Sequence, residues 1–102
     1  MKIEWTEPAV ADLQGIKEYI SRDSQFYANR FIGKIIDAVE SLENFPNRGR
    51  IVPEADDETI RELLFQPYRI IYKVIENKVT VLSVIHGGRD LSKKETKPWE
   101  VV

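Results

Sequence analysis

The sequence predicts an α+β fold, in which a short N-terminal strand and an α-helical hairpin pack on a C-terminal antiparallel β-meander. Two observations predict it. Apolar residues recur at helical spacing in the first half of the chain, and residues 59–85 form short runs of β-branched and aromatic residues separated by turn signals. Because short connections favour antiparallel neighbours, the expected element order is β-α-α-β-β-β.

The first elements follow from local signals. Lys2 to Trp5 is expected to be a short strand. A helix then begins at Thr6, which can cap it, and Pro8 is tolerated because its missing N–H would be unpaired in a first turn anyway. Asp23 or Ser24 can cap a second helix. The apolar stripe of the first helix consists of Ala9, Leu13, Ile16 and Ile20.

The second helix carries a wider apolar stripe, and so few residues separate the two helices that they should form an antiparallel hairpin. Pro46 cannot continue the helix, and Gly49 is expected to supply a turn. Residues 51–58 are interpreted as a polar connection, with 56–58 a solvated acidic loop. The stripe is made of Tyr27, Ala28, Phe31, Ile35, Ala38, Val39 and Leu42.

Three strands are expected in the second half, over residues 59–65, 68–75 and 79–85. Gln66-Pro67 marks the first turn, and Asn77 can take the positive φ that a tight hairpin needs. Helices on one side would leave the other sheet face partly open. On the middle strand, the set with both charges is placed on that outer face, namely Arg69, Ile71 and Lys73. The helix-facing set is then Ile70, Tyr72 and Val74.

This outer face is where we expect function. Cationic side chains are costly to hold in a sheet interior, so their presence suggests a face that meets something anionic. Residues 61–102 hold 8 Lys and Arg against 5 Asp and Glu, whereas residues 1–60 hold 7 against 12. The C-terminal half is therefore the more basic side, although a dedicated nucleic-acid binder would usually be basic overall and this chain has a net charge of −2.

Composition excludes several classes of site. With 102 residues, the chain is expected to form one domain. The absence of cysteine excludes disulfides and thiolate sites, and a single histidine disfavours a histidine-based metal centre, so we expect no metal and no cofactor. No apolar run approaches the length of about 18 residues that spans a membrane, and the first residues lack a signal-peptide pattern, so a cytoplasmic protein is expected.

Four segments in a fixed order carry a family resemblance. They are the helical hairpin with Tyr19 and Phe31, the Pro46 and Gly49-Arg50 that end it, Arg61-Glu62-Leu63 leading to Pro67-Tyr68-Arg69-Ile70-Ile71-Tyr72, and Val84-Ile85-His86 followed by Arg89-Asp90. Together they resemble the RelE/ParE superfamily, the toxins of type II toxin–antitoxin systems, and more closely its ParE-like (plasmid-stabilisation) branch. The resemblance covers residues 3–91, so we expect one toxin domain over 1–91 and a C-terminal tail over 92–102.

The resemblance implies a growth-inhibiting toxin that a cognate antitoxin neutralises in a hetero-oligomer. The ParE branch inhibits DNA gyrase, whereas the RelE branch cleaves mRNA in the ribosomal A site. RelE-type nucleases tend to be strongly basic, while this chain has a pI near 5.4, and its His86-Gly87-Gly88-Arg89-Asp90 segment looks like the ParE branch. A ParE-like toxin is therefore predicted. A ribosome-dependent mRNA endonuclease and a degenerate, binding-only homologue are the alternatives, so enzyme activity is left open.

For the ribonuclease alternative, the residues that would contact the scissile phosphate are Arg61, Arg69, His86 and Arg89. Glu54 or His86 would act as base or acid, and Tyr68 or Tyr72 would stack on a nucleobase.

Each of these residues also has a structural interpretation. His86 could be hydrogen-bonded at a strand end beside Asp90, and Arg89 could pin the turn through Asp90 or backbone carbonyls. Arg69 could pack over an aromatic ring, and Arg61 could form an ion pair with Glu62. The tail is either disordered or folds back through its tryptophan at position 99.

Overall fold

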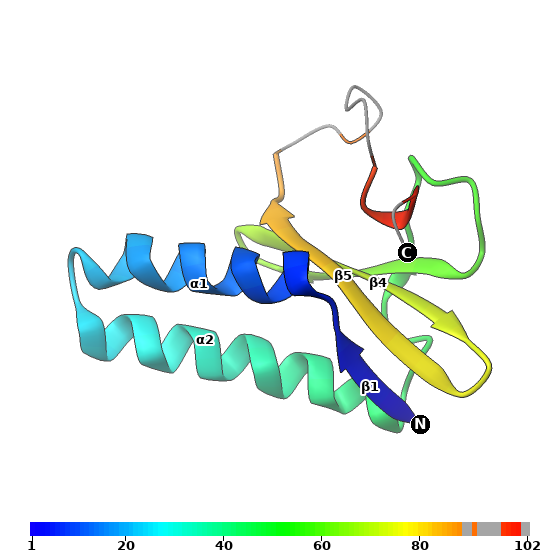
Figure 1. Cartoon of the computed structure of the whole chain (residues 1–102), viewed down its shortest axis with the longest axis horizontal. Coiled ribbons are helices and arrows are strands. Elements are labelled where there is room, and N and C mark those ends of the chain that lie inside the picture. Colours follow the sequence, from blue (N-terminus) through cyan, green and yellow to red (C-terminus); the bar gives the residue numbers. More distant parts are fainter. Residues whose placement is uncertain (89–90, 92–96, 101–102) are drawn as a thin grey trace.

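The computed structural model describes residues 1–88, 91 and 97–100 and has the predicted α+β order with three additions, a short strand and two 3-10 turns (Figure 1). Within these residues one five-stranded sheet has the order β1-β5-β4-β3-β2, with a helical hairpin against one face. Its elements are β1 (Lys2–Trp5), α1 (Glu7–Ser21), α2 (Gln25–Glu40), the 3-10 turn η1 (Ser41–Glu43), β2 (Arg50–Ile51), β3 (Ile60–Phe65), β4 (Tyr68–Ile75), β5 (Lys78–His86) and the 3-10 turn η3 (Pro98–Glu100).

Both helices begin where a hydroxyl can cap them. The Thr6 side chain accepts a hydrogen bond from the Ala9 N–H (3.3 Å), and the Ser24 side chain accepts one from the Tyr27 N–H (3.1 Å). Of the two candidates for the second cap, Ser24 is therefore the one used. The Thr6 hydroxyl also donates to the Val81 carbonyl (2.9 Å), which ties the start of α1 to β5.

Strand β1 pairs in parallel with β5, from Lys2 opposite Lys78 to Trp5 opposite Val81. Beyond the end of β1, helix α1 lies along the same edge of β5 and bonds to it. The Asp12 carboxylate accepts hydrogen bonds from the Val84 N–H (2.9 Å) and the Ser83 hydroxyl (2.8 Å). A side chain of α1 thus satisfies a backbone donor that no neighbouring strand reaches.

The main core lies between the helical hairpin and the sheet. Ile70, Tyr72 and Val74 of β4 belong to it or pack against it, which confirms the face predicted for this strand. The Tyr72 hydroxyl accepts from the Gly49 N–H (2.9 Å) and donates to the Pro46 carbonyl (2.8 Å), so it fixes the loop that follows α2. The chain bends at Gly49, as expected, but without a positive φ; glycine is needed there because the backbone of β3 passes too close for a side chain.

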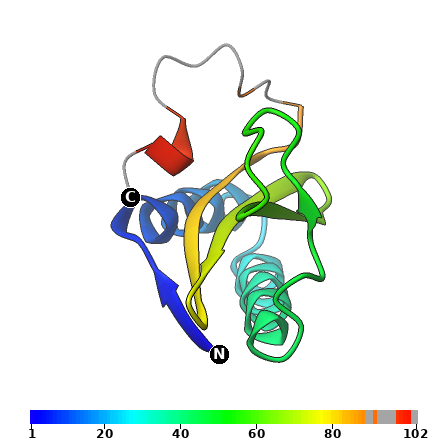
Figure 2. The same ribbon diagram turned by 90° about the vertical axis from the view of Figure 1, so that its right-hand side faces the viewer.

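The opposite face of the sheet is not open, contrary to expectation. A second core covers it, and in Figures 1 and 2 the β2–β3 connection (green) and η3 (red) lie on the far side of the sheet from α2. Residues 56–58 are exposed, as the predicted acidic loop requires, but within the same connection Val52 is fully buried and Ala55 packs against the second core. The second core contains Val52, Ile60, Ile71, Leu82, Ile85 and Leu91, with Ala55 and Trp99 packed against it.

The C-terminal expectations are resolved in part. Of the two alternatives for the tail, a disordered segment or one that folds back through Trp99, the second holds for Trp99, which packs against the second core. Arg89, Asp90 and the tail residues 92–96 and 101–102 lie outside the described residues. Within the described chain, no helix is both long and apolar enough to cross a bilayer.

Replacing Gly49 by alanine should destabilise the fold. The added Cβ would lie 2.6 Å from the Tyr72 hydroxyl oxygen and closer still to the Glu62 carbonyl oxygen, so the loop must shift, at a cost of about 2 kcal/mol. Gly15→Ala is the matched control, because its Cβ meets nothing within 4 Å and alanine favours a helix. Urea denaturation measures both; equal stabilities for the two variants would contradict this account of the loop.

Candidate functional site

A pocket of about 520 Å³ opens where β4 begins and β5 ends, between the β3–β4 turn and the segment that follows β2. Polar side chains from three separate stretches of the chain line it, which makes it the candidate site. The polar and charged side chains of the lining are those of Arg50, Glu54, Gln66, Tyr68, Arg69 and His86.

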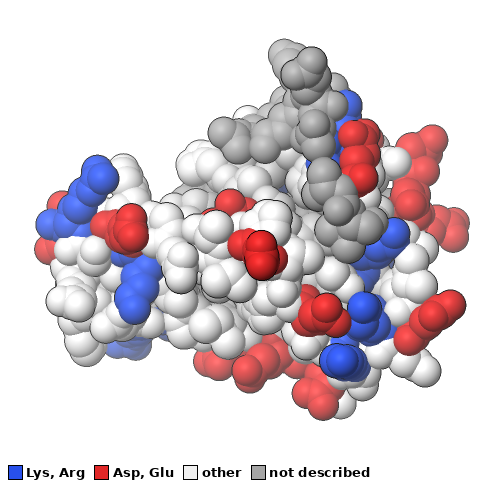
Figure 3. Space-filling model, in the orientation of Figure 1, with Lys and Arg blue, Asp and Glu red and all other residues white. Residues whose placement is uncertain are grey.

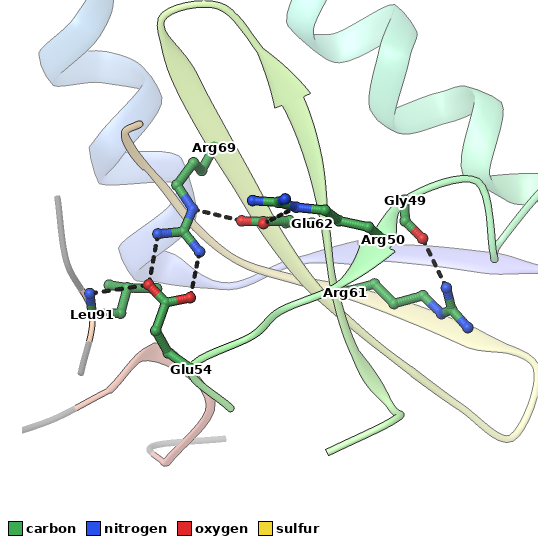
Figure 4. Close-up of polar contacts among 7 residues, drawn as sticks. All are labelled: Gly49, Arg50, Glu54, Arg61, Glu62, Arg69 and Leu91. Carbon is green, nitrogen blue, oxygen red and sulfur yellow. Dashed lines mark hydrogen bonds and ion pairs between the residues drawn. The ribbon is translucent and has the colours of Figure 1, made fainter. Parts of the chain in front are cut away.

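Arg69 lies at the floor of this pocket with its side chain only 7% exposed. Its Nε donates to Glu62 Oε1 (2.5 Å), and its two terminal nitrogens donate to the two oxygens of Glu54 (2.9 Å each), as Figure 4 shows. The bidentate bond to Glu54, with that to Glu62, raises the pKa of Arg69 despite its burial. The guanidinium is thus held by two internal carboxylates, and among the described residues it makes no cation–π contact with the aromatic rings that its neighbours suggested.

Glu62 connects Arg69 to a second arginine. Its carboxylate is fully buried and accepts from Arg69 on one oxygen and from Arg50 Nε (2.6 Å) on the other. The Arg50 side chain is 57% exposed and reaches the pocket from β2. Two carboxylates and two guanidiniums therefore form one chain, Glu54–Arg69–Glu62–Arg50, which we call the ion cluster.

Glu54 joins the ion cluster to the second core. The Arg69 hydrogen bonds lower its pKa from 4.5 to about 2, and the Leu91 N–H also donates to it (3.3 Å). Leu91 is fully buried in the second core. These donors hold the Glu54 carboxylate in its charged form. Through them Glu54 links the β2–β3 connection to β4 and to the chain after β5.

His86 stands at the exposed rim of the pocket. Its Nδ1 accepts a hydrogen bond from the Gly88 N–H (3.3 Å), which leaves Nε2 to face outward. Its ring lies edge-on to that of Tyr68, with centroids 6.0 Å apart, and Tyr68 in turn contacts Phe31 of α2 (5.9 Å). Burial raises the pKa of Tyr68, so its hydroxyl stays protonated and can donate.

Arg61 is on the other side of the sheet. It pairs in register with Tyr72, and its terminal nitrogen donates to the Gly49 carbonyl (2.8 Å). Because successive residues of a strand point to opposite faces, Arg61 cannot pair with its neighbour Glu62, and the predicted ion pair between them is wrong. Tyr72 is likewise buried against the helices, away from the pocket.

The pocket thus unites Glu54, Tyr68, Arg69 and His86 of the predicted site residues and leaves Arg61 out, while Arg89 is outside the described residues. Sequence analysis missed Arg50 and Glu62. Both depend on β2, a two-residue strand with no periodic signal of its own. Within the described chain, no group of three or more His, Cys, Asp or Glu is placed to hold a metal ion.

Comparison with known proteins decides the family. Residues 3–91 match the family described as "ParE toxin of type II toxin-antitoxin system, parDE". The chain belongs to this ParE toxin family. A ParE-family toxin acts within a toxin–antitoxin pair, so an antitoxin is its expected partner.

Named relatives and a solved structure agree with the assignment. The ParE-family chain is 35% identical to "Toxin RelE2" of Caulobacter vibrioides over 89 residues, which is 86% of this chain and 97% of that protein. It is 34% identical to "Putative toxin Y4kP" of Sinorhizobium fredii over 88 residues, 84% and 88% of the two chains. The structure titled "Chromosomal ParDE TA system from P. aeruginosa" has the same fold, with a TM-score of 0.71, 24% identity, and coverage of 84% and 95%.

Replacing Glu54 by glutamine should destabilise the toxin by about 2 kcal/mol at neutral pH, because Arg69 loses its charged partner and one of its two terminal nitrogens then faces an NH2 donor in place of an acceptor oxygen. The folded pKa of Glu54 is depressed, so its contribution is present above pH 4.5 and is lost as pH falls towards 2. Thermal unfolding from pH 7 to 2 should show the two proteins converging. Glu58→Gln, in the exposed part of the same loop, is the control, and a constant difference between wild type and Glu54→Gln at all pH values would refute the role of Glu54.

Proposed function

We propose that this ParE-family toxin arrests growth by binding an essential target protein, DNA gyrase first, and that it needs no cofactor. The observation that carries the proposal is the ion cluster. Arg69, the floor of the pocket, is engaged by Glu54 and Glu62 through all three guanidinium nitrogens. A metal-free nuclease needs cationic groups that are free to stabilise a pentavalent phosphate.

The remaining charges also favour binding over RNA cleavage. Arg61 donates to a backbone carbonyl on the other face, and the cluster carries as many carboxylates as guanidiniums. On the face seen in Figure 3, acidic and basic side chains are interspersed around the described residues. A protein that docks on ribosomal RNA gains affinity by neutralising many phosphates, and a chain with net charge −2 is poorly suited to that.

The antitoxin is proposed to cover the helical hairpin and part of the sheet. Large apolar side chains stand exposed where the hairpin turns, namely Tyr19 (66%), Phe26 (75%) and Tyr27 (54%). A groove of about 360 Å³ runs from this area between α1 and the end of β5. Stable partners bury apolar surface, so this area suits a permanent partner in a cytoplasmic toxin–antitoxin complex.

The second candidate is a ribosome-dependent mRNA endonuclease. Its specific support is that His86 and Tyr68 lie together at the rim of an open pocket, and that one relative is named Toxin RelE2. In that case His86 would act as acid or base and Arg69 and Arg89 would contact phosphate, with Arg61 outside the pocket.

The deciding experiment is induction of the toxin without antitoxin in a bacterial host, with sequencing of new RNA 5′ ends within minutes. The proposal predicts growth arrest without new cuts in translated regions, and inhibition of supercoiling by purified gyrase. His86→Ala should leave arrest within about twofold of wild type, since an exposed rim histidine is not needed to fold the chain.

Cuts in register with codons, abolished by His86→Ala, would establish the endonuclease instead. Arrest with neither cuts nor gyrase inhibition would keep the binding mechanism and reject gyrase as its target. No arrest at all, with tight antitoxin binding, would identify a degenerate homologue that only binds.

A further inference from the structure

We propose that the pocket recognises a single carboxylate on the toxin's target protein, and that Arg50 is the residue that binds it. This inference rests on the proposed function, in that it assumes a protein target. It does not depend on that target being gyrase.

The position and exposure of the Arg50 guanidinium suit it to bind an anion. Its Nε donates to the buried Glu62 (2.6 Å), which fixes the plane of the guanidinium. Its two terminal nitrogens have no hydrogen-bond partner among the described residues, and its side chain is 57% exposed at the pocket wall. Figure 4 shows its contact with Glu62. Two parallel N–H donors in one plane match a carboxylate, which accepts them in bidentate fashion.

The surrounding groups match one acid on a protein surface. Gln66 and Tyr68 bring an amide and a phenol to the same pocket, and Leu64, 53% exposed, gives it an apolar wall. Among the described residues, Arg69 pairs with two carboxylates and Arg50 with one, so Arg50 is the pocket guanidinium that can take another. A nucleic-acid strand brings many phosphates, whereas the charges of the ion cluster cancel and leave no net positive charge to neutralise them, so a polyanion is disfavoured and one acidic side chain is favoured.

Because polar and charged side chains line the pocket, we assign it to the target protein and not to the antitoxin. Its lining carries charged and polar side chains, as transient interfaces often do, whereas the exposed aromatic residues of the hairpin suit the permanent antitoxin. The two surfaces share a wall, because Tyr68 and His86 line both the pocket and the groove beside α1. An antitoxin seated in that groove would cover the rim of the pocket and so block the target.

The test compares Arg50→Gln with Arg48→Gln, a matched loss of charge two residues away, on a side chain that donates to Ser41 outside the pocket. Inducible expression measures the toxin level needed for arrest, and calorimetry measures the Kd of the purified complex with the neighbouring-gene antitoxin. We expect Arg50→Gln to need at least about tenfold more toxin for arrest, since a bound charge pair is lost. Its antitoxin Kd should change less than threefold, and Arg48→Gln should change neither.

Arg50→Lys keeps the charge and the bond to Glu62 but not the paired donors, so it should still be impaired if geometry matters. The melting temperature of each variant is measured beside wild type, and Arg50→Lys carries the test if Arg50→Gln does not fold. Arrest as strong as wild type in the folded variants would overturn the proposal. So would a tenfold weaker antitoxin Kd with normal arrest, which would assign the carboxylate to the antitoxin.

Discussion

The structure depends on the pairing of a buried guanidinium. Arg69 projects from the central strand β4 onto the sheet face away from the helices, where an unpaired charge would be untenable. Glu62 on the neighbouring strand satisfies one edge, and Glu54 must come across the sheet to satisfy the other. This draws the β2–β3 connection over the face, brings Val52 with it, and creates the second core on which Leu91 and Trp99 close.

The same pairing shapes the functional site. The pocket forms where the connection and the β3–β4 turn border the ends of β4 and β5, so its floor is the ion cluster. A guanidinium that is already paired with internal carboxylates is poorly placed to stabilise a phosphate as well. Arg50, at the outer end of the cluster, has an exposed side chain. One set of contacts therefore disfavours cleavage and provides a group for recognising a partner.

The sequence predicted well what local signals encode. Strands β1 and β4, the Thr6 cap, the positive φ of Asn77 (61°) and the helix-facing side of β4 are all as expected, because spacing and turn chemistry determine them. Prediction from the sequence failed where contacts between distant parts of the chain determine the structure. The parallel pairing of β1 with β5, the strand β2 and the covered outer face have no local signature. In a connection rich in acidic residues, nothing local shows that Val52 enters a core or that Glu54 pairs with Arg69. For the same reason Arg69 and His86 were recognised as site residues while Arg50 and Glu62 were not.

The most direct test of the account is NMR spectroscopy of the Arg69 guanidinium in the free toxin at neutral pH. We predict separate signals for its terminal N–H groups, slow exchange with water, and couplings across hydrogen bonds to the side-chain carboxyl carbons of Glu54 and Glu62. Millimolar inorganic phosphate should leave these signals unchanged. A freely rotating guanidinium with averaged signals that shift on addition of phosphate would contradict the account and return Arg69 to the role of a phosphate-binding residue.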